Sequence, residues 1–404
     1  VSPGPRRSTN DAPAGPVARL QEQLDAGEVR LNRDHEQQFL RDLLARLEVP
    51  VESQVLVFSK TSHQNPYITP KTPRAVYFGD DVYLGWVQGG VVEVADMSPT
   101  LGMTFYVLDH RDTTKPLKFE RTASCLDCHA SSRVNNLPGV LVRSVYPDAN
   151  GQPILSQGSF VTGHASPLSE RWGGWYVTGR HGDGRHMGNT LATETRDGMD
   201  FDPTAGANQL DLSGFFNVQP YLRGSSDIVA LMVLEHQVEM HNLITQANFE
   251  ARWALKHQAA LEGGESIPPD RFSESTRRRI AHAGDRLVRH MLFVNELELK
   301  DPIRGTSTFA EDFESRGPFD SQGRSLREFD LESRIFRYPL SYLIYSREFD
   351  GLPEPMREYV YRQLFDILTG KIATRDYLHL TNAVSRAIRE ILVETKADLP
   401  EHWK

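Results

Sequence analysis

Short apolar or alternating runs dominate the chain between about residues 54 and 180. Turn residues such as Gly79-Asp80-Asp81 and Gly89-Gly90 separate several of these runs, which is typical of β-strands joined by tight connections. The pattern therefore predicts a largely antiparallel sheet. The expected strands are Val55–Phe58, Ala75–Phe78, Val82–Val87, Val91–Val94, Met103–Leu108, Val140–Val145 and Trp175–Thr178.

Helical spacing of apolar residues precedes and follows this region. Four leucines predict a helix that ends at Val49-Pro50. These leucines are Leu40, Leu43, Leu44 and Leu47. After an irregular stretch at 181–224, rich in Gly, Asp and Asn, the second half becomes helical. The expected helices there span 225–257, 271–298, 332–346, 353–369 and 375–396. We therefore expect an α+β fold, with a β-rich, largely antiparallel N-terminal half followed by an all-α C-terminal half.

The expected organisation has three parts. Residues 1–16 carry four prolines and almost nothing apolar, so they are expected to be disordered. Residues 17–224 form the β-rich domain with its N-terminal helix, and residues 225–404 form a helical domain. Because the chain starts at Val1 and runs straight into the proline-rich tract, we interpret its start as a mature N-terminus after signal-peptide removal.

Composition narrows the classes of partner. The formal net charge of -9 argues against nucleic acid and favours a basic protein partner. No run approaches the roughly 18 consecutive apolar residues that a membrane-spanning helix needs. The chain is therefore not expected to span a membrane.

Both cysteines of the chain lie in one five-residue motif, Cys125-Leu126-Asp127-Cys128-His129. In a C-x-x-C-H motif, the two thiols can each add to a vinyl group of one porphyrin, and the histidine then bonds the iron. A redox dithiol of the thioredoxin kind, a zinc site and a chance pairing of two cysteines are the alternatives. The flanking Thr-Ala-Ser and Ala-Ser-Ser segments do not resemble a βαβ unit, and no third cysteine completes a zinc site. The motif therefore predicts one covalent haem c, with Cys125 and Cys128 as thioethers and His129 as proximal ligand.

This motif resembles that of the c-type cytochromes. Three further segments resemble a group of large single-haem bacterial cytochromes that have no assigned function. These segments are RAVYFGDDVYLGWVQGG at 74–90, SPLSERWGGWYVTGRHGDGRHMGN at 166–189 and FRYPLSYLIYS at 336–346. The resemblance implies a periplasmic or other extracytoplasmic haem protein whose redox potential depends on the second axial ligand. The size of the chain and its β-rich texture depart from small cytochrome c domains, so their helical fold is not expected.

Two regions offer a distal ligand for the iron. Met187 lies 58 residues after His129 in a glycine-rich loop, a spacing that resembles small cytochromes c. In the same loop, Arg180 and Arg185 are candidate partners of the haem propionates. His236 and His241 lie in the helix expected at 225–257 and are the other two distal candidates.

A bolder hypothesis is a second, non-haem metal site. Five histidines can contribute to it together with Glu170 or Glu235, although no tight H-x-H or H-x-x-x-H pair requires it. The histidines are His164, His181, His186, His236 and His241.

Three functions remain open at this stage. The first is electron transfer through a six-coordinate haem, with a basic redox protein or another cytochrome as partner. The second is a haem oxidoreductase with peroxidase, oxygenase or nitrogen-oxide chemistry, in which a small molecule binds the iron. The size of the chain motivates this second hypothesis, because a minimal electron carrier needs only one small domain. The third is a haem sensor or a subunit of a respiratory complex.

Overall fold

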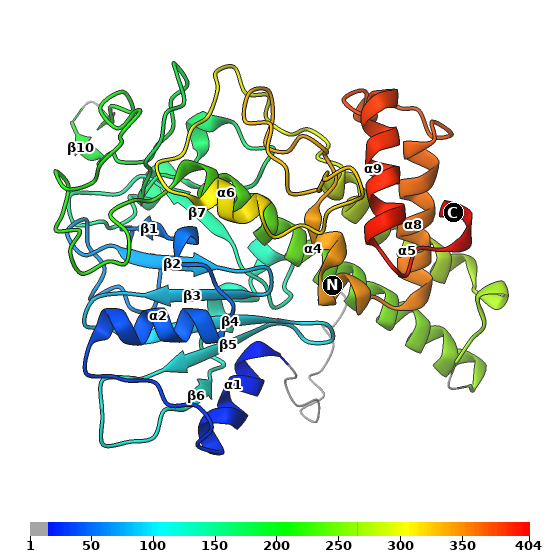
Figure 1. Ribbon diagram of the computed structural model, residues 1–404, viewed down its shortest axis with the longest axis horizontal. Helices are drawn as coiled ribbons and strands as arrows, with labels where there is room; N and C mark the ends of the chain where they lie inside the picture. Colours follow the sequence, from blue (N-terminus) through cyan, green and yellow to red (C-terminus); the bar gives the residue numbers. More distant parts are fainter. Residues whose placement is uncertain (1–14, 197, 265) are drawn as a thin grey trace.

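The computed structural model describes residues 15–196, 198–264 and 266–404 (Figure 1). Residues 1–14 of the tract expected to be disordered lie outside the described residues. Pro16, the last residue of that tract, is already the first residue of helix α1, a position that suits its fixed φ and its missing N–H.

A seven-stranded antiparallel sheet forms the centre of the N-terminal half. Its strand order is β6-β5-β4-β3-β2-β1-β9. The first six strands along the chain pair as successive neighbours, and the late strand β9 pairs with β1, with Leu56 opposite Tyr176. These strands are β1 Val55–Val57, β2 Arg74–Phe78, β3 Val82–Trp86, β4 Val92–Ser98, β5 Gly102–Leu108, β6 Phe119–Arg121 and β9 Trp175–Tyr176. The remaining strands form two small antiparallel pairs, β7 Val142–Val145 with β8 Ser159–Thr162, and β10 Thr193–Thr195 with β11 Gly198–Asp200.

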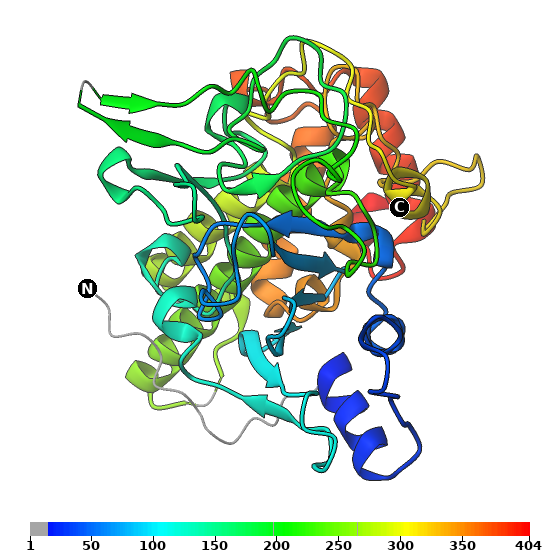
Figure 2. The same ribbon diagram turned by 90° about the vertical axis from the view of Figure 1, so that its left-hand side faces the viewer.

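The two faces of the large sheet pack against different helices. Side chains alternate between the faces with the period of two that a strand imposes. In β3, Leu84 packs with α1 (Pro16–Asp25) and α2 (Glu36–Arg46), whereas Tyr83 packs toward the C-terminal helices. Figure 2 views α2 along its axis and shows α1 and α2 on one side of the strands and the green helix α4 on the other.

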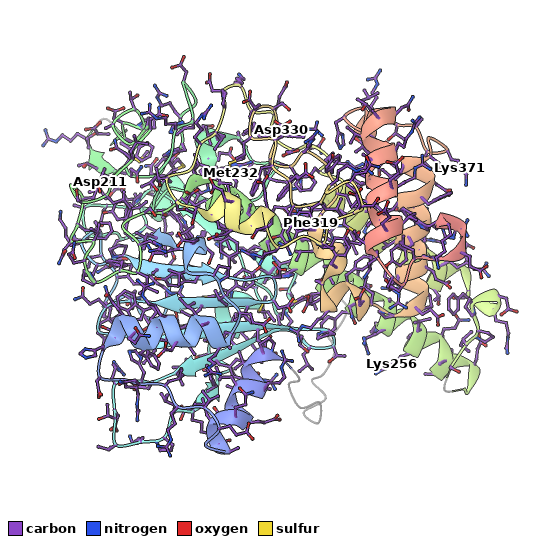
Figure 3. All side chains as sticks on the ribbon, viewed as in Figure 1. Asp211, Met232, Lys256, Phe319, Asp330 and Lys371 are labelled. Atoms are coloured by element: carbon purple, nitrogen blue, oxygen red, sulfur yellow. The ribbon has the colours of Figure 1, made fainter. Side chains whose placement is uncertain are left out.

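The longest helix, α4 (Ile228–Glu262), covers the second face of the sheet. Asp227 caps its N-terminus by accepting a hydrogen bond from the backbone N–H of Val229 at 2.8 Å. Apolar residues occur around most of its first half, which suits a helix that is buried on several sides. Figure 3 shows Met232 on this first half beside the sheet and Lys256 near the far end of the helix.

The other helices stack outward from α4. Helix α5 packs along α4, α8 packs along α5, and α9 packs along α8. One hydrophobic core joins residues of the sheet, such as Phe105, to residues of these helices. Among the described residues, no helix has both the length and the apolar character that crossing a membrane requires. The helices are α3 Leu126–His129, α5 Glu274–Met291, α6 Phe309–Glu314, α7 Arg347–Asp350, α8 Glu354–Leu368 and α9 Asn382–Thr395.

The α+β prediction is confirmed, but one expected helix is wrong. The segment 332–346 is mostly irregular and contains only a short 3-10 turn at Tyr342–Tyr345. Pro339 within this segment lacks a backbone N–H and restricts the residue before it, which prevents a continuous helix. Helix α5 also ends seven residues before the expected 298, because Phe293 and Asn295 adopt left-handed backbone conformations with φ of 54° and 64°.

Candidate functional site

A cavity of about 540 Å³ lies between the second face of the sheet and α4. Its volume falls in the range of roughly 300–1,000 Å³ that is usual for sites of small molecules and cofactors. The sheet supplies side chains from β1 to β5, and α4 supplies Leu234 and Val238. All three chemical groups of the C-x-x-C-H motif line this cavity, namely Cys125, Cys128 and His129. Further lining residues are Val57, Lys60, His63, Arg74, Val76, Tyr83, Gly85, Glu93, Ala95, Phe105, Arg133, Val140, Val142, Arg143 and Trp175.

The motif folds as the single helical turn α3. The backbone N–H of His129 donates to the carbonyl oxygen of Cys125 at 3.0 Å, which closes the turn and brings the two cysteines and the histidine to one wall. Cys125 is half-buried, whereas Cys128 is exposed. The motif therefore reaches from the cavity to the surface of the protein.

The imidazole of His129 is oriented by one hydrogen bond. Its Nδ1–H donates to the carbonyl oxygen of Gly139 at 2.9 Å, so Nε2 carries the lone pair. The ring of Phe105 packs against it with 4.7 Å between ring centroids. Burial lowers the pKa of His129, which keeps the ring neutral. A neutral imidazole with one nitrogen anchored to a carbonyl is the arrangement typical of a metal ligand.

The segment that anchors His129 is itself fixed to α4. Asn242 accepts a hydrogen bond from the backbone N–H of Val140 at 3.1 Å and donates to its carbonyl oxygen at 2.7 Å. Gly139 lies so close to Asn242 that a Cβ at this position would overlap the amide group of Asn242. Gly139 and Val140 therefore link the imidazole of His129 to Asn242 of α4.

The surroundings of the two thiols favour neither a zinc site nor a redox dithiol. Among the described residues, neither cysteine belongs to a group of three ligand atoms close enough to hold one metal ion. Burial raises the pKa of Cys125 to about 11. A redox-active C-x-x-C pair needs the opposite shift, because the thiolate is the reactive form. The two thiols lie along the wall of the cavity, and burial keeps the Cys125 thiol protonated.

Basic side chains surround the same cavity. Arg74 crosses directly over Gly85 and pairs with Glu93 at 2.5 Å. Arg143 donates from Nη2 to the hydroxyl oxygen of Ser159 at 3.2 Å. The Nε atoms of Arg74 and Arg143 are buried and have no hydrogen-bond partner in the described part of the chain. Unpaired buried donors are costly, so these two guanidinium groups are suited to an anionic ligand in the cavity.

The structure does not bring the remaining loop candidates to this cavity. Met187 is buried elsewhere, with its sulfur 3.5 Å from the hydroxyl of Ser144. Arg180 is exposed, and Arg185 donates to the carbonyl oxygens of Gly182 and Gly184. None of these three predicted residues lines the cavity.

His236 and His241 also lie outside the lining. His241 is nevertheless one contact away, because its Nδ1 is 2.8 Å from the hydroxyl of Tyr83, whose side chain does line the cavity. His236 packs with His164 on another side of α4. His63 is the second imidazole in the lining, and its Nε2 lies 3.2 Å from the carbonyl oxygen of Ser124.

The five histidines expected in a second metal site separate into different groups. His181 and His186 lie together with 4.7 Å between ring centroids. His164 and His236 instead join His290, which the sequence analysis did not identify. Glu235 forms a buried ion pair with Arg171, and Glu170 ends the 3-10 turn Leu168–Glu170.

Sequence reasoning also missed the basic residues of the cavity. Arg74 shares a strand face with Val76, so the alternation within β2 was a signal that this arginine points toward the core. Arg133, Arg143, Lys60 and His63 lie on segments whose orientation depends on the tertiary fold. Comparison with protein-family models, curated proteins and solved structures finds no match.

Proposed function

We propose that this chain is a c-type haem protein that transfers electrons. One haem would be bonded to Cys125 and Cys128, with His129 as an axial ligand of the iron. The observation that carries this proposal is the shared cavity: two thiols and an imidazole with a free Nε2 line it together. Because the thiols do not converge with the imidazole on one point, they suit a wide, rigid group better than a single ion.

The charges of the cavity support the same ligand. A haem carries two carboxylates, and Arg74 and Arg143 offer buried donors that lack partners in the described part of the chain. Val57, Val76 and Phe105 supply the apolar surface against which a porphyrin can pack. Cys128 is exposed, so the porphyrin edge bonded to it would lie at the surface, where a partner protein can exchange electrons. Since haem is attached outside the cytoplasm in bacteria, we propose an extracytoplasmic location.

A second candidate function follows from the ligands of the cavity. Its lining contains no methionine among the described residues, and its second imidazole, His63, is exposed and bonded to a backbone carbonyl. A sixth position without a strong protein ligand would admit a small molecule, which is the condition for haem catalysis. The oxidoreductase hypothesis therefore remains the alternative.

The first experiment tests attachment. The chain is produced with a haem-attachment system, and covalent haem is measured on a denaturing gel and by intact mass. We expect one haem per chain, and we expect Cys125→Ser with Cys128→Ser to abolish it. The control His282→Gln changes an exposed residue of α5 and should keep full occupancy. Absence of covalent haem in the unaltered chain would refute the proposal.

The second experiment separates electron transfer from catalysis. Visible spectra are recorded for the oxidised and reduced protein with and without carbon monoxide, nitric oxide or peroxide. A low-spin spectrum that ignores all three supports the electron carrier. A spectrum that changes on addition supports the oxidoreductase. His63→Gln should then alter the spectrum only if His63 reaches the iron.

A further inference from the structure

A second group of imidazoles lies on a different face of α4 from the cavity. Leu234 and Val238 line the cavity, whereas His236 is two residues from each and therefore about 200° around the helix from them. His164, from the loop after β8, and His290, from the last turn of α5, meet His236 there. All three are buried, with exposed fractions of 1 %, 0 % and 7 % for His164, His236 and His290.

The three rings are close enough to share one ligand. One ring nitrogen from each lies within 4.8 Å of the others. The Nδ1 atoms of His164 and His236 face each other at 2.9 Å, and the planes of the two rings are inclined by 20°. His290 stacks on this pair, with ring centroids 4.2 Å from His164 and 4.9 Å from His236. Phe293 covers the pair as well, stacking at 4.2 Å on His236.

Hydrogen bonds from the surroundings hold the side chains of His236 and His290 and the backbone of His164. Nε2 of His236 lies 2.8 Å from the hydroxyl of Ser341, and Nε2 of His290 donates to the carbonyl oxygen of His236 at 3.2 Å. The carbonyl oxygen of His164 accepts from Arg171 at 2.7 Å. Metal-bound histidines are typically oriented in this way, with one nitrogen held by an oxygen atom and the other directed inward.

A carboxylate stands at the edge of the group. Oε2 of Glu239, one helical turn after His236, is 3.8 Å from Nδ1 of His290. About half of the Glu239 side chain is exposed. It therefore places a carboxylate at the solvent-exposed edge of three otherwise buried rings.

We propose that His164, His236 and His290, with Glu239 as a fourth ligand, bind one divalent transition-metal ion. Neutral imidazole suits Zn²⁺, Cu²⁺, Ni²⁺ and Fe²⁺, and one carboxylate completes a four-coordinate set. This site is independent of the cavity and of any haem in it. Its composition differs from the five-histidine site expected from the sequence, because His290 and Glu239 replace His181, His186 and His241.

Binding an ion would require a defined local change. Ligands of a tetrahedral ion at about 2.0–2.1 Å lie roughly 3.3 Å apart, so the Nδ1 atoms of His164 and His236 must separate slightly from 2.9 Å. His290 must turn its ring out of the stack to direct Nδ1 at the ion. The competing arrangement is an N–H···N hydrogen bond between two neutral imidazoles with no metal. The first arrangement predicts stoichiometric metal binding, and the second predicts none.

The test uses the full chain without a histidine tag. After dialysis against a chelator, Co²⁺ is added and visible absorption is recorded, and Zn²⁺ is then added to displace it. We expect one equivalent of Co²⁺ to give the intense bands of a four-coordinate site, with loss of these bands on adding Zn²⁺. We expect His236→Gln and His290→Gln to weaken Co²⁺ binding at least tenfold. His282→Gln, an exposed histidine on α5, should bind as the unaltered chain does.

A variant at the exposed edge guards against misfolding. Glu239→Gln leaves the buried rings in place and should weaken Co²⁺ binding or change its spectrum, whereas Glu250→Gln on the same helix, similarly exposed, should not. Absence of stoichiometric Co²⁺ and Zn²⁺ binding in the unaltered chain would overturn the proposal. So would unchanged binding in both His236→Gln and His290→Gln. The Co²⁺ experiment requires no haem signal. It therefore tests the metal site even if the chain proves to bind no haem.

Discussion

The ion pair between Arg171 and Glu235 is the most deeply buried one described in the chain, and it supports the histidine group. The two side chains are 2 % and 0 % exposed and lie 3.1 Å apart. Arg171 also donates to the carbonyl oxygens of Ser166 at 2.9 Å and His164 at 2.7 Å. Glu235 directly precedes His236 on α4. Removing either charge should therefore affect both stability and the position of the neighbouring imidazoles.

The expected magnitudes follow from burial. Arg171→Met leaves the Glu235 carboxylate buried without a partner, and Glu235→Leu leaves the Arg171 guanidinium so. Each substitution should lower the free energy of unfolding by about 3–5 kcal/mol. The double variant replaces the pair with apolar side chains and should cost less than either single variant. Burial outweighs the attraction of Arg171 and raises the pKa of Glu235 to about 7, above its ordinary 4.5. Arg171 lowers this pKa, so in Arg171→Met the pKa of Glu235 should rise further. The variant then continues to lose stability as pH rises above 7, and Arg171→Met should cost more at pH 8 than at pH 6.

Urea unfolding followed by far-UV circular dichroism and tryptophan fluorescence measures these costs. Arg278→Met is the matched control, because Arg278 pairs with Glu274 at 2.7 Å on the surface, where such a pair contributes about 0–1 kcal/mol. If the two single costs simply add in the double variant, the pair does not act as a unit. That outcome would refute the reasoning.

Three further predictions concern the framework around the sites. Asp227→Ala should lower the unfolding free energy by about 2–4 kcal/mol, since its carboxylate caps α4 and accepts three hydrogen bonds of 2.8 Å from a neighbouring loop, and Asp227→Asn should lose less in a thermal melt. Gly151→Ala should cost about 1–3 kcal/mol, because φ is +82° and a Cβ would meet a backbone carbonyl. Gly158→Ala, at φ +87° with open space, should cost less in the same urea titration. Burial lowers the pKa of His186 to about 3 and of His241 to about 4, so stability present above about pH 6.5 should fall as pH drops, by about 2 kcal/mol for each at pH 5. Carboxyl groups with raised pKa values, such as Glu235, act in the opposite direction, so the test compares variants. A fall in urea midpoint from pH 7.5 to pH 5 that is as large in His186→Gln and His241→Gln as in the unaltered chain would contradict this.

Periodicity was a good guide to the strands and the long helices. The alternation at 75–78 and 103–108 predicted β2 and β5, because one face of each strand is buried against α1 and α2 and the other against α4. Helix α8 was predicted within one residue at each end. The helix predicted at 332–346 was wrong. Buried aromatic residues such as Tyr342 have the spacing of the apolar face of a helix, but Pro339 interrupts the backbone.

The site was predictable only where its residues are adjacent in sequence. The C-x-x-C-H motif is local, so its three groups could be named in advance. Arg74 and Arg143 reach the same cavity through tertiary packing, which single-sequence spacing does not encode. Likewise, His164 and His290 are 126 positions apart, and only the packing of α5 on α4 brings them together.

The position of α4 has a consequence for the order in which the protein is assembled. All lining residues of the cavity other than Leu234 and Val238 lie at or before position 175, so one side of the cavity stays open until α4 packs on the sheet. A rigid cofactor bonded to Cys125 and Cys128 would enter through this open side, and docking of α4 would then enclose it. On the proposed function, α4 and the C-terminal half would then serve as a cover that closes over the haem after its attachment.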